Sequence, residues 1–292
     1  MHKHSVDCIV RFHDVKRLVE LNRCIFSLLG QSYRPLNIIL VLQRFSAPEV
    51  EETRQELRSL LEQTGAPTLT LCNLEQPLPH DARTLLLNIG LRAARGRYVT
   101  FLDYDDVIYP EAYALLLERL KVSGAAIAFA GIRVVKVDVF QQFMRIKQEI
   151  KSPFGLGNSL RDLFDGNFCP IHSFMIDRER INGEDLYFDE SLTWEEDYDF
   201  LLRICAKYKS DFARIDSSIG DYYYKEDGSN TIPVNGLHSP EQVQAYAQVS
   251  TMIEARRRTT IVSPEVQSGH GLWPVKPDMT IREFMTAVPG RT

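Results

Sequence analysis

The sequence lacks the features that mark a disulfide scaffold, a zinc site or a secreted protein. Its five cysteines are scattered over 292 residues, and no two of them form a Cys-x-x-Cys pair. An odd number at irregular spacing indicates reduced thiols and no zinc site. The first residues also lack the apolar core of a signal peptide. We therefore expect a cytoplasmic protein.

Long apolar runs are missing too, because none approaches the ~18 residues that a membrane-spanning helix needs. Peripheral contact with the inner face of a membrane leaves no such signal and stays open. Basic residues are not concentrated either. The formal net charge is -5, and the single dense basic run, 256–258, is expected to decorate a solvated helix face. This balance argues against a nucleic acid partner.

Glycine-rich phosphate loops are absent as well. No Gly-x-Gly-x-x-Gly follows the first apolar run, which argues against a dinucleotide-dependent dehydrogenase, and there is no Walker-type loop. A sugar-phosphate nucleotidyltransferase is disfavoured for a similar reason, because the segment Val10-Arg-Phe-His-Asp14 contains no glycine. With 44% hydrophobic and 25% charged residues, the composition is ordinary for a globular protein.

Apolar runs typical of buried strands alternate with helical stretches over the first half of the chain. Strands are predicted at 6–10, 36–42, 68–72, 98–102 and 125–137, and helices at about 14–29, 49–63, 82–94 and 110–122. Because these strands are apolar on both faces, they predict an α/β fold with a parallel sheet. The second half is less regular: a polar connection at 141–158, strands at 171–176 and 212–224, helices at 194–208 and 239–257, and a tail from 261.

The strand predicted at 98–102 ends in three carboxylates within four residues, Asp103, Asp105 and Asp106. Ligands of open α/β sheets bind outside the carboxyl ends of the strands. Carboxylates crowded there repel one another unless a cation or a donor-rich ligand lies between them. A hard cation bridged to a substrate diphosphate meets this need. The run therefore points to nucleotide-dependent transfer chemistry.

Three motifs then follow one another: Leu87-Asn88-Ile-Gly90, Gly96-Arg-Tyr-Val-Thr-Phe-Leu-Asp103-Tyr-Asp105-Asp106 and Trp194-Glu195-Glu196-Asp197. In this order they resemble the glycosyltransferase family 2 enzymes, over roughly residues 5–230. The resemblance implies a GT-A fold, a Rossmann-like, mostly parallel open sheet with flanking helices, here with a C-terminal helical extension. We expect a domain at 1–232, with a nucleotide-sugar half at about 1–137 and an acceptor half at about 138–232. The C-terminal helix and tail are expected at 233–292.

The same resemblance assigns roles to the carboxylates after the strand. Asp103, with Tyr104 beside it, would bind the nucleotide sugar through its ribose, and Asp105 would hold Mn²⁺ or Mg²⁺. Asp106 is instead expected to cap the following helix.

The resemblance also makes Asp197 the base that removes the acceptor hydroxyl proton. Glu196 is the alternative, although Thr193-Trp-Glu-Glu196 also fits a capping box that would tie Glu196 to Thr193. The macrodipole of the helix would favour an ionised Asp197, whereas burial beside Trp194 would raise its pKa.

Further donor contacts are carried over to Phe12, His13, Gln43 and Arg83. Relatives commonly place an aspartate where Gln43 stands, so the base of the nucleotide stays open, with a UDP-sugar expected first. In Tyr222-Tyr-Tyr-Lys225-Glu-Asp-Gly, Lys225 stands for the arginine of a family segment that closes over the diphosphate.

On the acceptor side, we expect His172, Trp194 and Glu196 to form the wall. A tryptophan ring can stack on the apolar face of a sugar. His172 could bond an acceptor hydroxyl or serve as a satisfied core histidine.

The sequence thus predicts an inverting, metal-dependent glycosyltransferase. It would move a sugar from a nucleoside diphosphate sugar to a hydroxyl of a glycan or glycolipid, in surface polysaccharide or lipopolysaccharide biosynthesis. The alternative is a non-catalytic nucleotide-sugar-binding protein with a GT-A fold.

Overall fold

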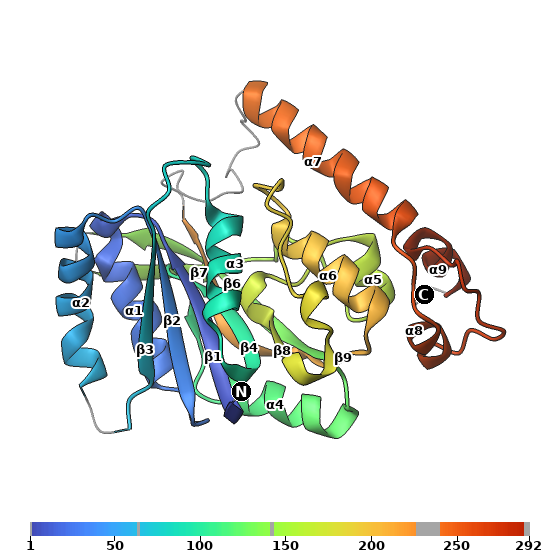
Figure 1. Cartoon of the computed structure of the whole chain (residues 1–292), viewed down its shortest axis with the longest axis horizontal. Coiled ribbons are helices and arrows are strands. Elements are labelled where there is room, and N and C mark those ends of the chain that lie inside the picture. Colours follow the sequence, from blue (N-terminus) through green and yellow to red (C-terminus); the bar gives the residue numbers. More distant parts are fainter. Residues whose placement is uncertain (1, 63–64, 141–142, 226–239, 289–292) are drawn as a thin grey trace.

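A computed structural model describes residues 2–62, 65–140, 143–225 and 240–288 (Figure 1). The boundary predicted at residues 232 and 233 lies outside these residues, so the division into domains stays a prediction. Among the described residues no helix is long and apolar enough to cross a membrane.

The centre of the molecule is an open sheet in the order β3-β2-β1-β4-β8-β6-β9-β5, with β7 paired to β6. The parallel part consists of β1 (His2–Phe12), β2 (Leu36–Gln43), β3 (Thr68–Leu74) and β4 (Gly96–Asp103). β8 (Phe174–Asp177) is antiparallel to β4 and to β6 (Ile127–Val139), whereas β6 is parallel to β9 (Ser210–Lys225). The predicted α/β fold with a mostly parallel open sheet is confirmed.

The two remaining strands, β5 (Val107–Ile108) and β7 (Met144–Glu149), are antiparallel to their partners. β7 lies inside the segment predicted to be a polar connection, and that interpretation is wrong for its residues. Pairing with β6 satisfies the backbone of β7, so the strand forms although five of its six residues are exposed.

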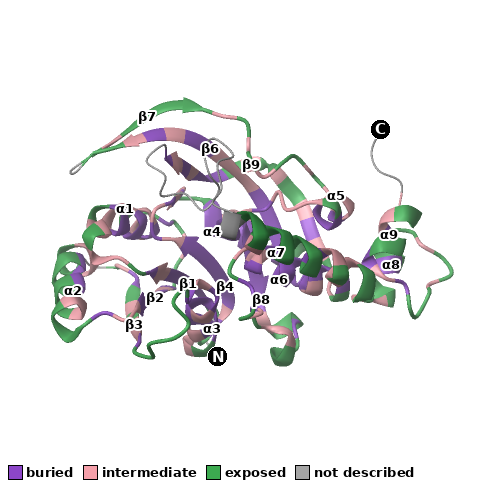
Figure 2. Cartoon of the chain, turned by 90° about the horizontal axis from the view of Figure 1, so that it is seen from above, coloured by how far each residue is buried: buried purple, intermediate pink, exposed green. Residues whose placement is uncertain are grey.

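Helices cover both faces of the sheet because the side chains of its central strands alternate between two cores. Ile38 and Leu40 join one core with helices α1 (Leu18–Leu29), α2 (Ala47–Leu61) and α4 (Ala112–Ser123). Ile39 and Val41 join the other core with α3 (Arg83–Ala93), α5 (Leu160–Asp165) and α6 (Glu196–Lys207). Figure 2 shows the resulting buried strands between these helices. Short 3₁₀ turns lie at Val15–Arg17, Ile171–Ser173, Arg178–Arg180 and Gly183–Asp185.

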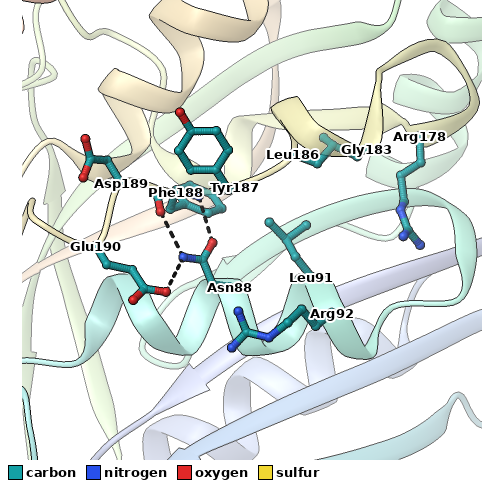
Figure 3. Close-up of a pocket in the computed structure, with 10 residues that line it drawn as sticks. All are labelled: Asn88, Leu91, Arg92, Arg178, Gly183, Leu186, Tyr187, Phe188, Asp189 and Glu190. Atoms are coloured by element: carbon teal, nitrogen blue, oxygen red, sulfur yellow. Dashed lines mark hydrogen bonds between the residues drawn. The ribbon is translucent and has the colours of Figure 1, made fainter.

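The Asn-x-Gly motif in α3 has a structural role. A Cβ atom on Gly90 would lie 2.4 Å from Cγ2 of Ile9, so only glycine lets α3 pack this closely on β1. Asn88 donates to the Phe188 carbonyl at 2.9 Å and to Glu190 Oε1 at 2.8 Å, and accepts the Phe188 N–H at 2.8 Å (Figure 3). These bonds fix the chain between β8 and α6. The cavity of about 510 Å³ beside them holds none of the predicted site residues.

The C-terminal segment packs on α6. α7 (Pro240–Thr259) leads to α8 (Pro264–Gly269) and α9 (Ile281–Ala287), which lie at one end of the molecule (Figure 1). Ile281 and Phe284 are fully buried in the same core as α6. The basic run was expected to be solvated, and this is wrong for two of its members. Arg256 pairs with Asp199 at 2.6 Å, and Arg257 donates to the Tyr198 hydroxyl at 2.8 Å.

Candidate functional site

Two adjoining cavities lie at the carboxyl ends of β1, β2 and β4. The first, of about 440 Å³, contains the predicted donor residues His13, Gln43, Arg83, Asp103, Tyr104 and Asp105. The second, of about 420 Å³, contains the predicted acceptor residues and base, His172, Trp194, Glu196 and Asp197. The two cavities share a wall made of Arg11, Arg83, Asp103, Asp106 and Tyr222. The fold therefore brings residues from distant parts of the chain to one place.

Phe12 is the one predicted site residue that lines neither cavity. It is fully buried and packs edge-on against Tyr104, with 5.1 Å between ring centroids, and against Phe45 at 5.4 Å. Phe12 packs against the Tyr104 ring and does not line the first cavity itself.

Asp103 is held by a residue that the motifs did not single out. Arg11 donates through Nε to Asp103 Oδ1 at 2.6 Å and through Nη2 to Oδ2 at 3.2 Å. Burial opposes ionisation of Asp103, but the Arg11 guanidinium outweighs it and lowers the pKa of this carboxyl. The signal was present in the sequence, since a charge inside the apolar run of β1 requires a buried partner.

Arg11 also joins the two cavities. Its Nη1 donates to Glu196 Oε1 at 2.6 Å, so one guanidinium bridges the end of β4 and the start of α6. The capping box predicted for Glu196 is wrong, because its carboxylate bonds Arg11 and not the Thr193 amide. A charge-assisted bond to a guanidinium is stronger than one to a neutral amide.

Asp105 pairs with Lys225, the last residue of β9. The Nζ atom of Lys225 lies 2.6 Å from Asp105 Oδ2 and 3.9 Å from Glu20 Oε1. The Lys225 side chain is 1% exposed, whereas that of Asp105 is 27% exposed at the first cavity. A buried ammonium thus neutralises the carboxylate that was predicted to hold a metal.

Asp106 does not cap the following helix, and that prediction is wrong. The N-cap of α4 is Glu111, and Asp106 is buried with its Oδ1 accepting the Tyr223 N–H at 2.9 Å. The strand β9 supplies this donor from a remote part of the chain. Burial, together with the charges of Asp105 and Asp103, raises the pKa of Asp106 well above its usual range.

These contacts bear directly on the predicted Mn²⁺ or Mg²⁺. Among the described residues no group of three or more His, Cys, Asp and Glu side chains is placed to hold a metal ion. Asp103 bonds Arg11, Asp105 bonds Lys225, and Asp106 bonds a backbone amide. The donor set therefore does not fit a preformed metal centre, and metal use stays a prediction.

Asp197 lies in the first turn of α6, where the sequence placed it, on the wall of the second cavity. It accepts its own helix's Tyr198 N–H at 2.7 Å and the Asn167 side-chain amide at 3.3 Å. Burial first, and then the charges of Glu196 and Glu195, raise the pKa of Asp197 to about 8. Burial and like charge therefore outweigh the helix macrodipole at this position.

The residue before α6, Glu195, has a strained backbone conformation. Glu195 has a φ of +58°, in the left-handed region that residues other than glycine rarely adopt. Such a conformation persists only where the surroundings hold it in place, and it is concentrated at functional sites.

His172 is 1% exposed and lines the second cavity near the carboxylates that follow β4. Neither ring nitrogen has a hydrogen-bond partner among the described residues, and Nδ1 is 3.7 Å from Asp106 Oδ2. Burial lowers the pKa of His172 to about 4, so the ring is neutral at physiological pH. It is therefore not a satisfied core histidine, and its nitrogens can bond a ligand in the second cavity.

An aromatic pair closes the far side of the second cavity. Trp194 packs against Tyr246 of α7 with 5.5 Å between ring centroids, and both side chains line the cavity. Tyr246 comes from α7 in the C-terminal segment, for which no motif predicts a role in the site. Nothing in the sequence pattern of α7 marks it, because only the packing of α7 on α6 brings it here.

Gln43 lines the first cavity alone, whereas Arg83 belongs to the wall that the two cavities share. Gln43 Nε2 donates to the His80 carbonyl at 3.1 Å, and Arg83 pairs with Asp81 at 2.9 Å. The side-chain oxygen of Gln43 remains an acceptor for a nucleotide base. The guanidinium of Arg17 lines the same cavity.

Comparison with known proteins places these features in a family. The model of "Glycosyl transferase family 2" matches residues 12–182, which is more than half of the chain. The succinoglycan biosynthesis protein ExoO of Rhizobium meliloti is 30% identical over 149 residues, covering 49% of this chain and 42% of that protein. The chain spans less than half the length of the curated relatives that it matches.

Solved structures agree on the fold. S. aureus TarS 1-349 in complex with UDP is 16% identical with a TM-score of 0.59, over 92% of this chain and 69% of that one. The mannosyltransferase PcManGT from Pyrobaculum calidifontis, in complex with GDP-Man and Mn²⁺, is 13% identical with a TM-score of 0.51, over 99% of this chain and 86% of that one. At such identities the likeness concerns the fold alone.

Proposed function

The chain belongs to glycosyltransferase family 2, and on that premise we propose that it catalyses an inverting sugar transfer from a nucleoside diphosphate sugar to a hydroxyl of a glycan or glycolipid. A UDP-sugar is the expected donor, and TarS, which shares the fold, has been captured with UDP. The name of ExoO supports a role in surface polysaccharide biosynthesis.

One observation carries the proposal. Asp197, with its pKa raised to about 8, lies on the wall of a cavity that adjoins the cavity of Asp103 and Asp105. A base near neutral pKa combines a strong proton affinity with a useful ionised fraction. Its place across a shared wall from the donor residues is the arrangement that an inverting transfer needs.

The chemistry follows from this arrangement. An acceptor hydroxyl in the second cavity attacks C1 of the donor sugar from the face opposite the diphosphate. Its oxygen forms the new bond to C1 while the bond from C1 to the diphosphate oxygen breaks, and that oxygen keeps the electron pair. Asp197 takes the hydroxyl proton. Attack from the opposite face inverts the anomeric configuration.

The other residues bind and orient. Trp194 and Tyr246 offer ring faces to the acceptor sugar, and His172 offers to a hydroxyl a ring nitrogen that has no hydrogen-bond partner among the described residues. Gln43 and Tyr104 line the part of the first cavity where a nucleoside would lie, while Arg17 and Arg83 bring positive charge toward the phosphates. Holding both reactants across one wall replaces a bimolecular encounter by an oriented one.

The test is a transfer assay with a panel of UDP- and GDP-sugars and mixed carbohydrate acceptors. We expect one donor to release its nucleoside diphosphate in step with product, and NMR of the new linkage to give the anomer opposite to the donor. A product with the donor's own configuration would contradict the inverting mechanism. Binding of nucleotide sugars without any transfer would favour the non-catalytic alternative.

A further inference from the structure

The three carboxylates at the end of β4 lie close together, and each has a positively charged or N–H partner from the protein itself. Crowded carboxylates need positive charge or hydrogen-bond donors between them. Arg11 from β1 reaches Asp103 with two bonds, and Lys225 from β9 reaches Asp105 at 2.6 Å. Asp106 accepts a backbone N–H from Tyr223, two residues before Lys225. Each carboxylate is thus satisfied from within the chain.

Lys225 differs from an ordinary surface lysine in its burial. With 1% of its side chain exposed, its ammonium group is withdrawn from water and held between Asp105 and, more distantly, Glu20. A charge buried this deeply is stable only with a partner, and removing the partner is strongly unfavourable. A cation arriving at Asp105 would be repelled by this ammonium, which already bonds one oxygen of the carboxylate. It would also find Asp103 already engaged by Arg11.

We propose that Lys225 is the built-in counter-ion of Asp105, in the place that the sequence assigns to a divalent cation, and that this protein binds the diphosphate of its donor without a metal. The proposal rests on the proposed function for the identity of the ligand. Arg11 and Lys225 set one positive charge beside each of Asp103 and Asp105, and each cation also has a second carboxylate near it, Glu196 and Glu20. Arg17 and Arg83, which line the same cavity, add positive charge on the side where a diphosphate would bind.

In the transfer step Lys225 is a positioning residue. It keeps Asp105 neutralised while the bond from C1 to the diphosphate oxygen breaks and that oxygen takes the electron pair. Without Lys225, the Asp105 carboxylate would repel the negative charge developing on the departing diphosphate. Asp105 would then be open to a divalent cation, which could restore the balance.

The first measurement uses the unaltered protein and needs no donor sugar. The chain is stripped with EDTA and titrated with Mn²⁺ alone by calorimetry, and then with UDP and GDP in EDTA and in Mn²⁺. We expect weak binding of Mn²⁺ alone, and an affinity for one diphosphate that changes by less than about threefold between the two buffers. Tight one-to-one binding of Mn²⁺ alone, or diphosphate binding only with Mn²⁺, would overturn the proposal.

The second measurement replaces the ammonium by an apolar group of similar length, Lys225→Met. In EDTA this variant should bind the diphosphate about tenfold or more weakly, and its Tm should fall because Asp105 is left unpaired. Mn²⁺ should raise both the affinity and the Tm of this variant and leave the wild type unchanged. Lys225→Arg, which keeps the charge, should restore binding in EDTA.

The matched control is Arg119→Met, which breaks the pair between Arg119 of α4 and Asp211 of β9 at 2.8 Å, outside both cavities. Its Tm should fall without any recovery in Mn²⁺. A Lys225→Met variant that behaves like this control would contradict the proposal. If neither UDP nor GDP binds the wild type in any buffer, the proposed function fails, whereas binding that requires Mn²⁺ leaves that function standing and removes only the role of Lys225.

Discussion

Two acidic clusters face each other across the shared wall, and they behave in opposite ways. The β4 cluster, Asp103, Asp105 and Asp106, receives two cations, the partly buried Arg11 of β1 and the buried Lys225 of β9. Among the described residues, the α6 cluster, Glu195, Glu196 and Asp197, has one ion pair with a cation, that of Glu196 with Arg11. The pKa of Asp103 is lowered, whereas the pKa of Asp197 is raised to about 8. The placement of cations, and not the number of acids, separates a binding carboxylate from a base.

Arg11 sets this difference. Both clusters contain three acids within four residues, and both are partly buried. Because the Arg11 fork gives two bonds to Asp103 and one to Glu196, Asp197 is left beside two other carboxylates with an amide from Asn167 as its side-chain donor. Environments that push the pKa values of nearby carboxyls apart are those that assign acid and base roles.

The largest effect should come from removing the proposed base. We expect Asp197→Asn to lower the rate of transfer by about 100- to 10,000-fold, since an amide cannot accept the acceptor proton. Binding of the nucleoside diphosphate should be unchanged, because Asp197 lines only the second cavity. Single-turnover transfer and nucleotide titration check the two statements. Transfer by the variant at the wild-type rate would remove Asp197 from the mechanism.

The two clusters should also make the free energy of unfolding depend on pH in opposite directions. Asp103→Asn loses a partly exposed ion pair with Arg11 and should cost about 1–3 kcal/mol near neutral pH. The lowered pKa of Asp103 means that its contribution is present above the unfolded pKa and is lost as the pH falls through the folded value.

Asp197 follows the reverse rule. Its folded pKa lies above the unfolded one, so the folded protein binds the extra proton and loses stability as the pH rises from about 4 toward 8. The free energy of unfolding of Asp197→Asn, relative to that of wild type, should therefore increase from about pH 5 to about pH 9. Asp103→Asn should be less stable than wild type at both pH values. Urea unfolding at the two pH values checks this. A parallel response of the two variants would mean that the clusters do not differ.

The sequence predicted the fold and the location of the site for physical reasons that are local. Apolar runs that end in polar residues mark the carboxyl edge of a parallel sheet, so Asp103, Asp105 and Gln43 were expected at one edge. Helix starts are local as well, and Asp197 was expected in the first turn of α6, as the structure has it.

What the sequence did not predict depends on contacts between distant segments. The partners of the acids are 92 and 120 residues away, as for Arg11 with Asp103 and Lys225 with Asp105. Tyr246 reaches the second cavity only because α7 packs on α6. The predicted caps at Asp106 and Glu196 failed because Tyr223 and Arg11 offered these carboxylates other donors. A sequence pattern within a few residues does not show which remote donors compete with a predicted cap.

The smallest expected effect tests the α6 cluster from within. Asp197 must be ionised to act as a base, so kcat/KM should rise about tenfold per pH unit below about 8 and level off above it. The charge of Glu195 contributes to the raised pKa of Asp197. Glu195→Gln should therefore move the rising limb of the plot of kcat/KM against pH to lower pH, by less than about one unit. At pH 7 the variant would then be a few-fold faster than wild type. Glu184→Gln, an exposed glutamate outside both cavities, is the control and should leave the limb in place. A limb that stays fixed in Glu195→Gln, or that moves to higher pH, would mean that like charge does not set the proton affinity of Asp197.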